Sequence, residues 1–253
     1  MERITFKNEA GLSLAGHFYA APSKSIVIMT HGFLSNKSSS GRFDRFALKL
    51  QQNGYNVLTY DCGGYGESDD TAIHFDKQVT DLKAAKEYSH TRGMERFAYW
   101  GHSLGGRLSL TCYDKDIETM VLTGPVTGAI SYQHVDDFSK EQVAQCECNG
   151  SMVFYVDDPW RSEIVLDKQM LDDFDYMDQA ATLQSVHCPI LVIHGTEGDL
   201  ERELAQITKK AAHLFPTGTK LVELDGADHS FMNQLDEIEI LGLHWLHDHF
   251  SVR

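Results

Sequence analysis

The stretch that decides the fold of this 253-residue chain runs Phe97-Ala98-Tyr99-Trp100-Gly101-His102-Ser103-Leu104-Gly105-Gly106-Arg107-Leu108-Ser109-Leu110. It begins with apolar and aromatic residues, as in a buried strand, and Leu104 and Leu108 then follow helical spacing. Glycines two residues before and two after Ser103 relieve the backbone crowding of a sharp strand-to-helix turn. Such a turn exposes the serine hydroxyl beside amides at a helix N-terminus, which favour an anion. We therefore predict that Ser103 is a nucleophile.

The length and composition are those of one folded domain with an insertion. Hydrophobic residues make up 42% of the chain, which argues against disorder. The formal net charge of −15 argues against nucleic acid or an anionic membrane surface as a partner, because both require a basic surface. No apolar signal segment follows Met1, and no run approaches the roughly 20 apolar residues that span a bilayer, so we expect no membrane span. The odd number of cysteines, five, indicates reduced thiols and a cytoplasmic location.

Strand-like and helix-like segments alternate along most of the chain. Residues 2–20 predict an antiparallel hairpin. We expect further strands at residues 25–29, 55–60, 97–101, 120–123, 189–193 and 220–224. We expect helices at residues 42–53, 76–92, 201–214 and 234–250. The alternation predicts an α/β fold, a mostly parallel twisted sheet with helices on both faces, whose site is built by loops at the carboxyl ends of the strands.

One segment breaks this alternation. We therefore divide the chain into a core, residues 1–125 and 186–253, and an inserted cap, residues 126–185. The cap contains twelve acidic against three basic residues, and we interpret this charge as a solvated outer face. A cap must also offer apolar surface to a substrate, and aromatic residues are the candidates for it. They are Tyr132, Phe138, Phe154, Tyr155, Trp160, Phe174 and Tyr176.

A serine hydroxyl needs an adjacent base, which is usually histidine because its pKa lies near neutrality. Of the thirteen histidines, His229 is the best placed, since it lies between the last strand and the last helix. His102 is next to Ser103 in the chain, but neighbouring side chains at such a turn point apart. An acid must orient the base, and the loop after the preceding strand offers two. We favour Asp199 and keep Glu197 as the alternative acid.

A tetrahedral intermediate needs backbone amides that bind its oxyanion. The first should be the amide of Leu104, directly after the nucleophile. The second should be the amide of Phe33, in the loop after an early strand. The histidines near residues 244–249 lack the spacing of a metal site, and the glycine-rich loop at 61–68 lacks a phosphate-binding pattern. We expect neither a metal nor a cofactor.

Five pieces of the chain carry a resemblance to a known superfamily. They are His31-Gly32-Phe33, residues 61–68, Gly101-His102-Ser103-Leu104-Gly105-Gly106, residues 189–199 and Gly226-Ala227-Asp228-His229. In this order they resemble the α/β-hydrolase superfamily, and most of all its compact bacterial carboxylesterases, which include cinnamoyl and feruloyl esterases and carry a short inserted cap. The resemblance implies ester hydrolysis through a serine acyl-enzyme without a cofactor. It also implies an aspartate at the position of Gly198, whereas Asp199 lies one residue further along.

The leading hypothesis is a serine carboxylesterase that acts on a small or medium, mostly uncharged ester. A thioesterase or lysophospholipase for longer acyl chains shares every part and stays an alternative, as does a non-catalytic binding module on the same fold. A peptidase or a carbon–carbon bond hydrolase has no supporting feature. An epoxide hydrolase or dehalogenase is disfavoured, because those enzymes use an aspartate where this chain has Ser103. The oligomeric state is left open, a homodimer included.

Overall fold

The computed structural model describes residues 1–131 and 138–252. Its main sheet contains β1 (Glu2–Lys7), β2 (Ser13–Tyr19), β3 (Ser25–Thr30), β4 (Asn56–Tyr60), β5 (Arg96–His102), β6 (Ile117–Thr123), β9 (Ile190–Gly195) and β10 (Lys220–Leu224). The strands lie in the order β1-β2-β4-β3-β5-β6-β9-β10. β2 pairs antiparallel with β1 and with β4, and all other neighbours are parallel. The predictions of an N-terminal hairpin and a mostly parallel sheet are confirmed.

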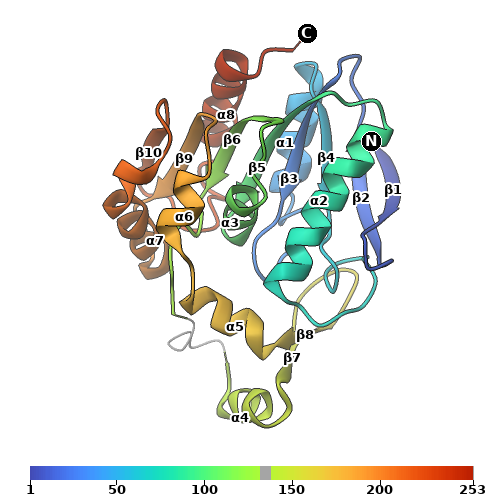
Figure 1. The fold of residues 1–253 in the computed structure, drawn as a ribbon, viewed down its shortest axis with the longest axis vertical. Coiled ribbons are helices and arrows are strands. Elements are labelled where there is room, and N and C mark those ends of the chain that lie inside the picture. Colours follow the sequence, from blue (N-terminus) through green and yellow to red (C-terminus); the bar gives the residue numbers. More distant parts are fainter. Residues whose placement is uncertain (132–137, 253) are drawn as a thin grey trace.

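Helices cover both faces of this sheet, as predicted (Figure 1). The core helices are α1 (Arg42–Gln52), α2 (Phe75–Thr91), α3 (Leu104–Thr111), α7 (Asp199–Lys210) and α8 (Leu235–His249), with a short 3₁₀ helix, η2 (Ala212–Leu214). α1 and α8 bury their apolar residues in one cluster with one face of the sheet, while α2 and α3 pack into a second cluster.

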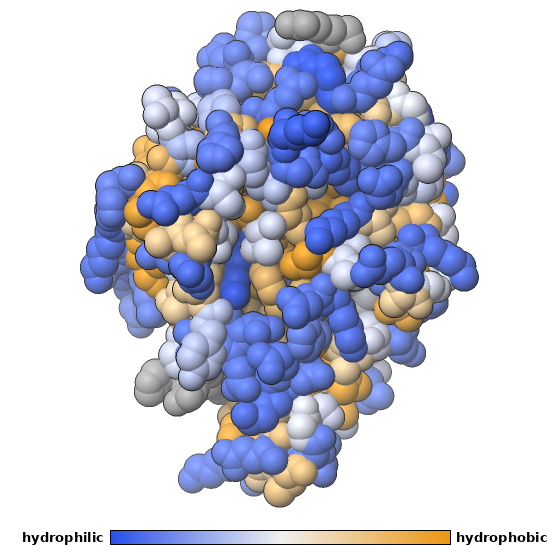
Figure 2. Space-filling model, viewed as in Figure 1, coloured by the Kyte–Doolittle hydropathy of each residue, from blue (hydrophilic) through white to orange (hydrophobic). Residues whose placement is uncertain are grey.

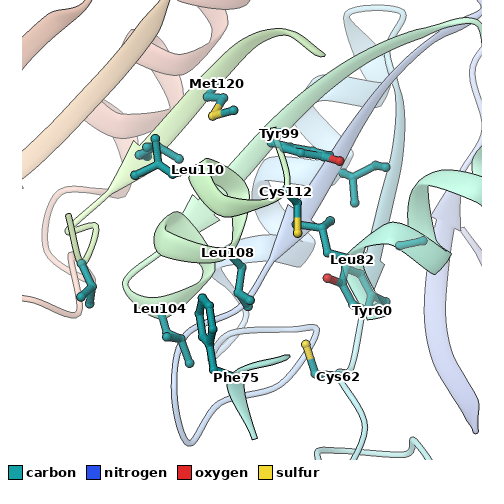
Figure 3. Close-up of a cluster of buried hydrophobic side chains, with 14 of the residues drawn as sticks. Tyr60, Cys62, Phe75, Leu82, Tyr99, Leu104, Leu108, Leu110, Cys112 and Met120 are labelled. Carbon is teal, nitrogen blue, oxygen red and sulfur yellow. The ribbon is translucent and has the colours of Figure 1, made fainter. Parts of the chain in front are cut away.

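The helix that follows the predicted nucleophile is fixed by buried apolar side chains. Leu104 and Leu108 of α3 lie beside Phe75 of α2, in a cluster that also contains Tyr60 and Cys62 (Figure 3). Full burial of a Leu or Phe side chain contributes about 1.5–3 kcal/mol. This packing holds the start of α3 in one place relative to the sheet.

Three predicted helices begin and end within one residue of their observed bounds, and one does not. The helix predicted at 201–214 begins two residues earlier, at Asp199, and ends at Lys210. Gly198 precedes it with φ 81°, a conformation that favours glycine. The earlier start turns the side chains of this helix relative to the site.

Between β6 and β9 the chain forms a separate unit of short elements. They are α4 (Lys140–Asn149), β7 (Ser151–Tyr155), β8 (Glu163–Asp167), α5 (Lys168–Asp175) and α6 (Gln179–Gln184). β7 and β8 form their own antiparallel sheet. Figure 1 shows α4, α5 and this sheet together at one end of the molecule. That residues 126–185 act as a cap stays a prediction.

Two arginines join this unit to the core by donating to backbone carbonyls. Arg107 of α3 donates to the carbonyl oxygens of Asp173, at 2.5 Å, and Tyr176, at 3.4 Å. Arg161 donates to the carbonyls of Gly64, Gly66 and Ser68 at 2.8, 2.9 and 2.7 Å. Among the described residues, no helix has the length and apolar character needed to cross a membrane.

Candidate active site

Ser103 lies in the sharp turn between β5 and α3 that the sequence predicts. Its φ of 54° and ψ of −118° are strained values for a residue other than glycine. A Cβ atom at Gly101 would lie 2.4 Å from the carbonyl oxygen of Gly105, and one at Gly105 would lie 2.0 Å from that of Thr30. The two glycines are therefore required by close backbone contacts. The amide of Ser103 donates to the carbonyl of Thr123 at 3.0 Å, which ties the turn to β6.

His229 reaches the serine from the loop between β10 and α8, as predicted. Its Nε2 lies 2.9 Å from Oγ of Ser103. The loop is held by Asp228, whose Oδ1 accepts hydrogen bonds from the amides of Ser230, at 2.9 Å, and Phe231, at 3.1 Å. The Ser230 hydroxyl also donates to it and lowers the pKa of the Asp228 carboxyl. Arg42 of α1 donates to the carbonyl of Ser230, which also anchors the loop to α1.

The acid beside His229 is Glu201, in the first turn of α7. Its Oε2 accepts a hydrogen bond from Nδ1 of His229 at 2.5 Å. Its Oε1 accepts from Nδ1 of His194 at 2.7 Å and from the amide of Gly195 at 2.9 Å. The Glu201 side chain is fully buried. Both carboxylate oxygens therefore have donors and no contact with solvent.

The prediction that Asp199 orients His229 is wrong, and the alternative, Glu197, does not reach His229 either. The Asp199 side chain is fully exposed and pairs with Arg202 at 2.9 Å. Glu197 is 60% exposed and lies 3.6 Å from Arg202. With 3.6 residues per helical turn, residues two apart point about 200° away from each other. Because α7 begins at Asp199, an inward Glu201 leaves Asp199 facing solvent.

A signal for Glu201 is present in the sequence. The buried residues of α7 are Glu201, Leu204, Ala205 and Thr208. They are spaced as one face of a helix, so Glu201 is a carboxylate in an inward row. An acid in such a row needs a buried partner, and this criterion would have selected it.

Two of the buried titratable groups of the site have shifted pKa values. Burial raises the pKa of the Glu201 carboxyl, but hydrogen bonds from His194 and His229 outweigh it, so the net shift is downward. The pKa of His102 lies well below its usual range because of burial, and Arg42 adds to this. His102 is therefore neutral at pH 7. Its Nδ1 lies 3.1 Å from the hydroxyl of Thr123, and its ring packs 5.0 Å from that of His229.

The two amides predicted to bind an oxyanion lie in segments that border Ser103. Leu104 is the first residue of α3, where an amide has no partner within the helix. A Cβ atom at Gly32 would lie 3.1 Å from Cβ of Ser103, so the loop that leads to Phe33 passes directly beside the serine. That these amides bind an oxyanion stays a prediction.

The peptide that joins Gly32 to Phe33 is fixed by a buried histidine. Nδ1 of His31 donates to the Gly32 carbonyl at 2.8 Å, and its Nε2 accepts from the amide of Cys62 at 3.2 Å. Burial lowers the pKa of His31, which keeps the ring neutral and able to make both bonds. Because the Gly32 carbonyl and the Phe33 amide share one planar peptide, the first bond also orients the second group.

The surroundings of the site include apolar side chains of the inserted segment. The ring of Phe174 in α5 meets that of Phe33 edge-on, 5.4 Å away. On the face of the molecule seen in Figure 2, apolar residues gather near the middle, with hydrophilic residues around them. A separate cavity of about 260 Å³ lies between residues 34–36 and 154–158, and its lining includes neither Ser103 nor His229. Tyr155 and Tyr176, by contrast, are exposed, and Tyr132 lies outside the described residues. In the described part of the chain, no group of three or more His, Cys, Asp or Glu is arranged to hold a metal.

The fold and this arrangement of residues define an α/β hydrolase. A family model described as serine aminopeptidase, S33, matches residues 21–236, which is most of the chain. The protein therefore belongs to this family of hydrolases.

Two relatives match parts of the chain. The thiohydrolase apmlB of Arthrinium phaeospermum is 27% identical over 194 residues, which cover 70% of this chain and 60% of that protein. A 2-hydroxy-6-oxononadienedioate/2-hydroxy-6-oxononatrienedioate hydrolase of Paraburkholderia phymatum is 28% identical over 127 residues, 49% of this chain and 44% of that protein. The chain thus spans less than two thirds of the length of either relative.

Solved structures of similar fold match nearly the whole chain. DcsB, in complex with its substrate analogue, has a TM-score of 0.80 at 18% identity, with 99% of both chains covered. Est1E from Butyrivibrio proteoclasticus, with bound ferulic acid, has a TM-score of 0.78 at 16% identity, with 98% of this chain and 99% of that chain covered. At these identities the likeness shows the fold alone.

Proposed function

We propose that the protein cleaves a small or medium, mostly uncharged carboxylic ester through an acyl-enzyme on Ser103. One observation carries the proposal, the continuous hydrogen-bonded path through the site. It runs from Oγ of Ser103 to Nε2 of His229 at 2.9 Å, and from Nδ1 of His229 to Oε2 of Glu201 at 2.5 Å. A nucleophile, a base and a buried acid joined in this way are the parts that acyl transfer requires.

The first half of the reaction forms the acyl-enzyme. Oγ of Ser103 attacks the carbonyl carbon of the ester, its proton passes to Nε2 of His229, and the carbonyl oxygen becomes an oxyanion. The amides of Phe33 and Leu104 are the proposed donors to that oxyanion. When the carbonyl re-forms, the bond to the alcohol oxygen breaks and His229 gives its proton to the departing alcohol. Glu201 stabilises the imidazolium and stays ionised throughout.

The second half releases the acid. A water molecule attacks the acyl carbon while His229 takes one of its protons. The second tetrahedral intermediate collapses, the bond to Oγ breaks, and His229 returns the proton to Ser103. The net reaction consumes one ester and one water and yields one acid and one alcohol, so the reaction as proposed needs no cofactor.

Two features support an apolar, uncharged substrate. The aromatic rings of Phe33, which follows Gly32 in the loop beside Ser103, and Phe174 pack against each other and would offer apolar contact to an acyl or alcohol group. The net charge of −15, much of it in residues 126–185, repels anionic substrates, although salt screens this effect.

A thioester is the second candidate substrate. The similarity to a thiohydrolase favours it, and the same path of residues would serve a thiolate leaving group. The hydrogen-bonded path from Ser103 through His229 to Glu201 argues against a non-catalytic binding module, because a protein that only binds a ligand does not need a base hydrogen-bonded to the serine.

The test is a series of hydrolysis rates. We expect the purified protein to hydrolyse p-nitrophenyl esters with short acyl chains, or the aromatic ester methyl ferulate, faster than p-nitrophenyl esters with long acyl chains. We expect Ser103→Ala to remove this activity. A maximum at long acyl chains or with acyl thioesters would favour the second candidate. Folded protein with no activity above that of Ser103→Ala on any of these substrates would contradict the proposal.

A further inference from the structure

A second histidine contacts the buried acid from the side opposite His229. His194, at the end of β9, is only 4% exposed. Its Nδ1 lies 2.7 Å from Oε1 of Glu201. Because a carboxylate can only accept, Nδ1 of His194 is the donor in this bond. Glu201 is therefore held between two imidazole rings, one at each oxygen.

The hydrogen-bonded path continues beyond His194 into the start of the inserted segment. Nε2 of His194 lies 2.8 Å from the hydroxyl of Thr208 in α7, and that hydroxyl lies 2.8 Å from the hydroxyl of Thr127. Thr208 and Thr127 are both buried. If Thr127 donates to Thr208 and Thr208 donates to Nε2, the ring keeps its proton on Nδ1, where Glu201 needs it. The path thus runs unbroken from Thr127 to Ser103.

Physical chemistry gives His194 a specific task. A buried carboxylate is costly unless each oxygen has donors. Rotation about the last side-chain bond of a glutamate is also soft, so one contact at Oε2 would not fix the plane of the carboxylate. At Oε1, Nδ1 of His194 and the amide of Gly195 both donate, and together they fix that plane and keep Oε2 directed at His229.

We propose that His194 is a positioning residue, which holds the Glu201 carboxylate ionised and oriented toward His229 and links it through Thr208 to Thr127. Its effect on turnover rests on the function proposed above, whereas its effect on the Glu201 carboxylate does not. Among the residues that the structure describes, the titratable groups hydrogen-bonded to Glu201 are His194, from β9, and His229, from the loop after β10, and the Gly195 amide is the third donor.

The test compares three substitutions of the same residue. His194→Asn places an amide nitrogen near the position of Nδ1, so it keeps a donor to Glu201. His194→Gln places one near the position of Nε2, so it keeps only the contact to Thr208. His194→Leu keeps neither. His17→Asn is the matched control. His17 is also buried, but it lies in β2, near Asp44 and several strands away from His194 in β9.

The first readout is the pKa of the Glu201 carboxyl, which is measured by ¹³C NMR and requires no turnover. We expect this pKa to rise in His194→Leu and His194→Gln and to stay close to the wild-type value in His194→Asn and His17→Asn. The second readout is ester hydrolysis. We expect kcat to fall about ten- to a hundredfold in His194→Leu, the effect of one hydrogen bond to a charged group, with KM unchanged, and to recover in His194→Asn.

The outcomes separate this inference from the proposed function. An unchanged Glu201 pKa in His194→Leu, or a better recovery with glutamine than with asparagine, would refute the role of His194. The predicted order of pKa values in a protein without hydrolase activity would refute only the proposed function. If the variants do not fold, the ¹⁵N signal of His194 Nδ1 in the wild-type protein decides. It should move as Glu201 titrates, and a signal that does not move contradicts the inference.

Discussion

Ser103 and Glu201 both contact the ring of His229, but the molecule holds them by different means. The backbone places Ser103, through a left-handed φ of 54° and glycine positions where any Cβ would meet a carbonyl oxygen. Hydrogen bonds at the tip of a long side chain place Glu201, which reaches back from the first turn of α7. A group placed by the backbone can come from one position only. A group placed at the tip of its side chain can come from any position from which that tip reaches.

The largest effect that tests this contrast is the loss of the acid itself. We expect Glu201→Ala to lower kcat by about a thousand- to ten-thousandfold, because the base loses the group that orients it and stabilises its charge. Asp199→Ala, two residues away in the same helix, should leave kcat unchanged. Steady-state rates on one p-nitrophenyl ester give both numbers. A large loss in Asp199→Ala with little loss in Glu201→Ala would mean that the acid comes from the position first expected.

The glycines of the two regions should respond differently to alanine. At Gly105 a Cβ would lie 2.0 Å from a backbone oxygen, so we expect Gly105→Ala to reduce the free energy of unfolding by about 3 kcal/mol or more. At Gly198 a Cβ would meet open space, and only its φ of 81° opposes alanine, at about 1 kcal/mol. Urea unfolding of both variants measures the difference. An equal loss of unfolding free energy in the two variants would contradict the expectation that a close backbone contact costs more than a positive φ.

Shortening the acid tests whether reach is what matters. Glu201→Asp keeps the charge but withdraws the carboxylate by one methylene group from His229 and His194. We expect kcat to fall about tenfold or more, with KM unchanged, because the base is held less firmly. The kcat of this variant should lie between those of the wild type and Glu201→Ala. A wild-type rate would show that the position of the tip is not critical.

The smallest of these effects is a pH dependence of stability. The pKa of Glu201 in the folded protein lies below its ordinary value of 4.5. Ionised Glu201 therefore contributes stability above about pH 4.5, and this contribution is lost as the pH falls through the lower folded value. Glu201→Gln lacks this contribution, so the difference in unfolding free energy between the two proteins should shrink from pH 6 to pH 3. A difference that stays constant over this range contradicts an ionised Glu201.

Sequence reasoning placed Ser103 and His229 because both depend on backbone features. Glycine is required two residues before and after Ser103 because the backbone contacts there leave no room for a side chain. The position of His229, between the last strand and the last helix, identifies it as the base. The alternation of strands and helices gave the layers of the fold in the same way. These features are local or follow chain order, so they can be recognised in one sequence.

The acid could not be placed in this way, because it depends on where one helix begins. Gly198, with a φ of 81° that favours glycine, precedes α7, which begins two residues before the predicted position and turns Asp199 outward. The partner of Glu201, His194, becomes visible only when α7 packs against β9. Contacts between side chains that are distant in sequence are only weakly indicated by the sequence. Here the indication is an acid, Glu201, in the row of α7 residues that faces inward.

The central claim, that Ser103 carries the acyl group, is tested most directly by mass spectrometry of the protein quenched during turnover of a p-nitrophenyl ester. We predict a mass increase of one acyl group, located on the peptide that contains Ser103, and its absence in Ser103→Ala. A protein that hydrolyses the ester without this adduct on Ser103, or that keeps the adduct in Ser103→Ala, would contradict the account.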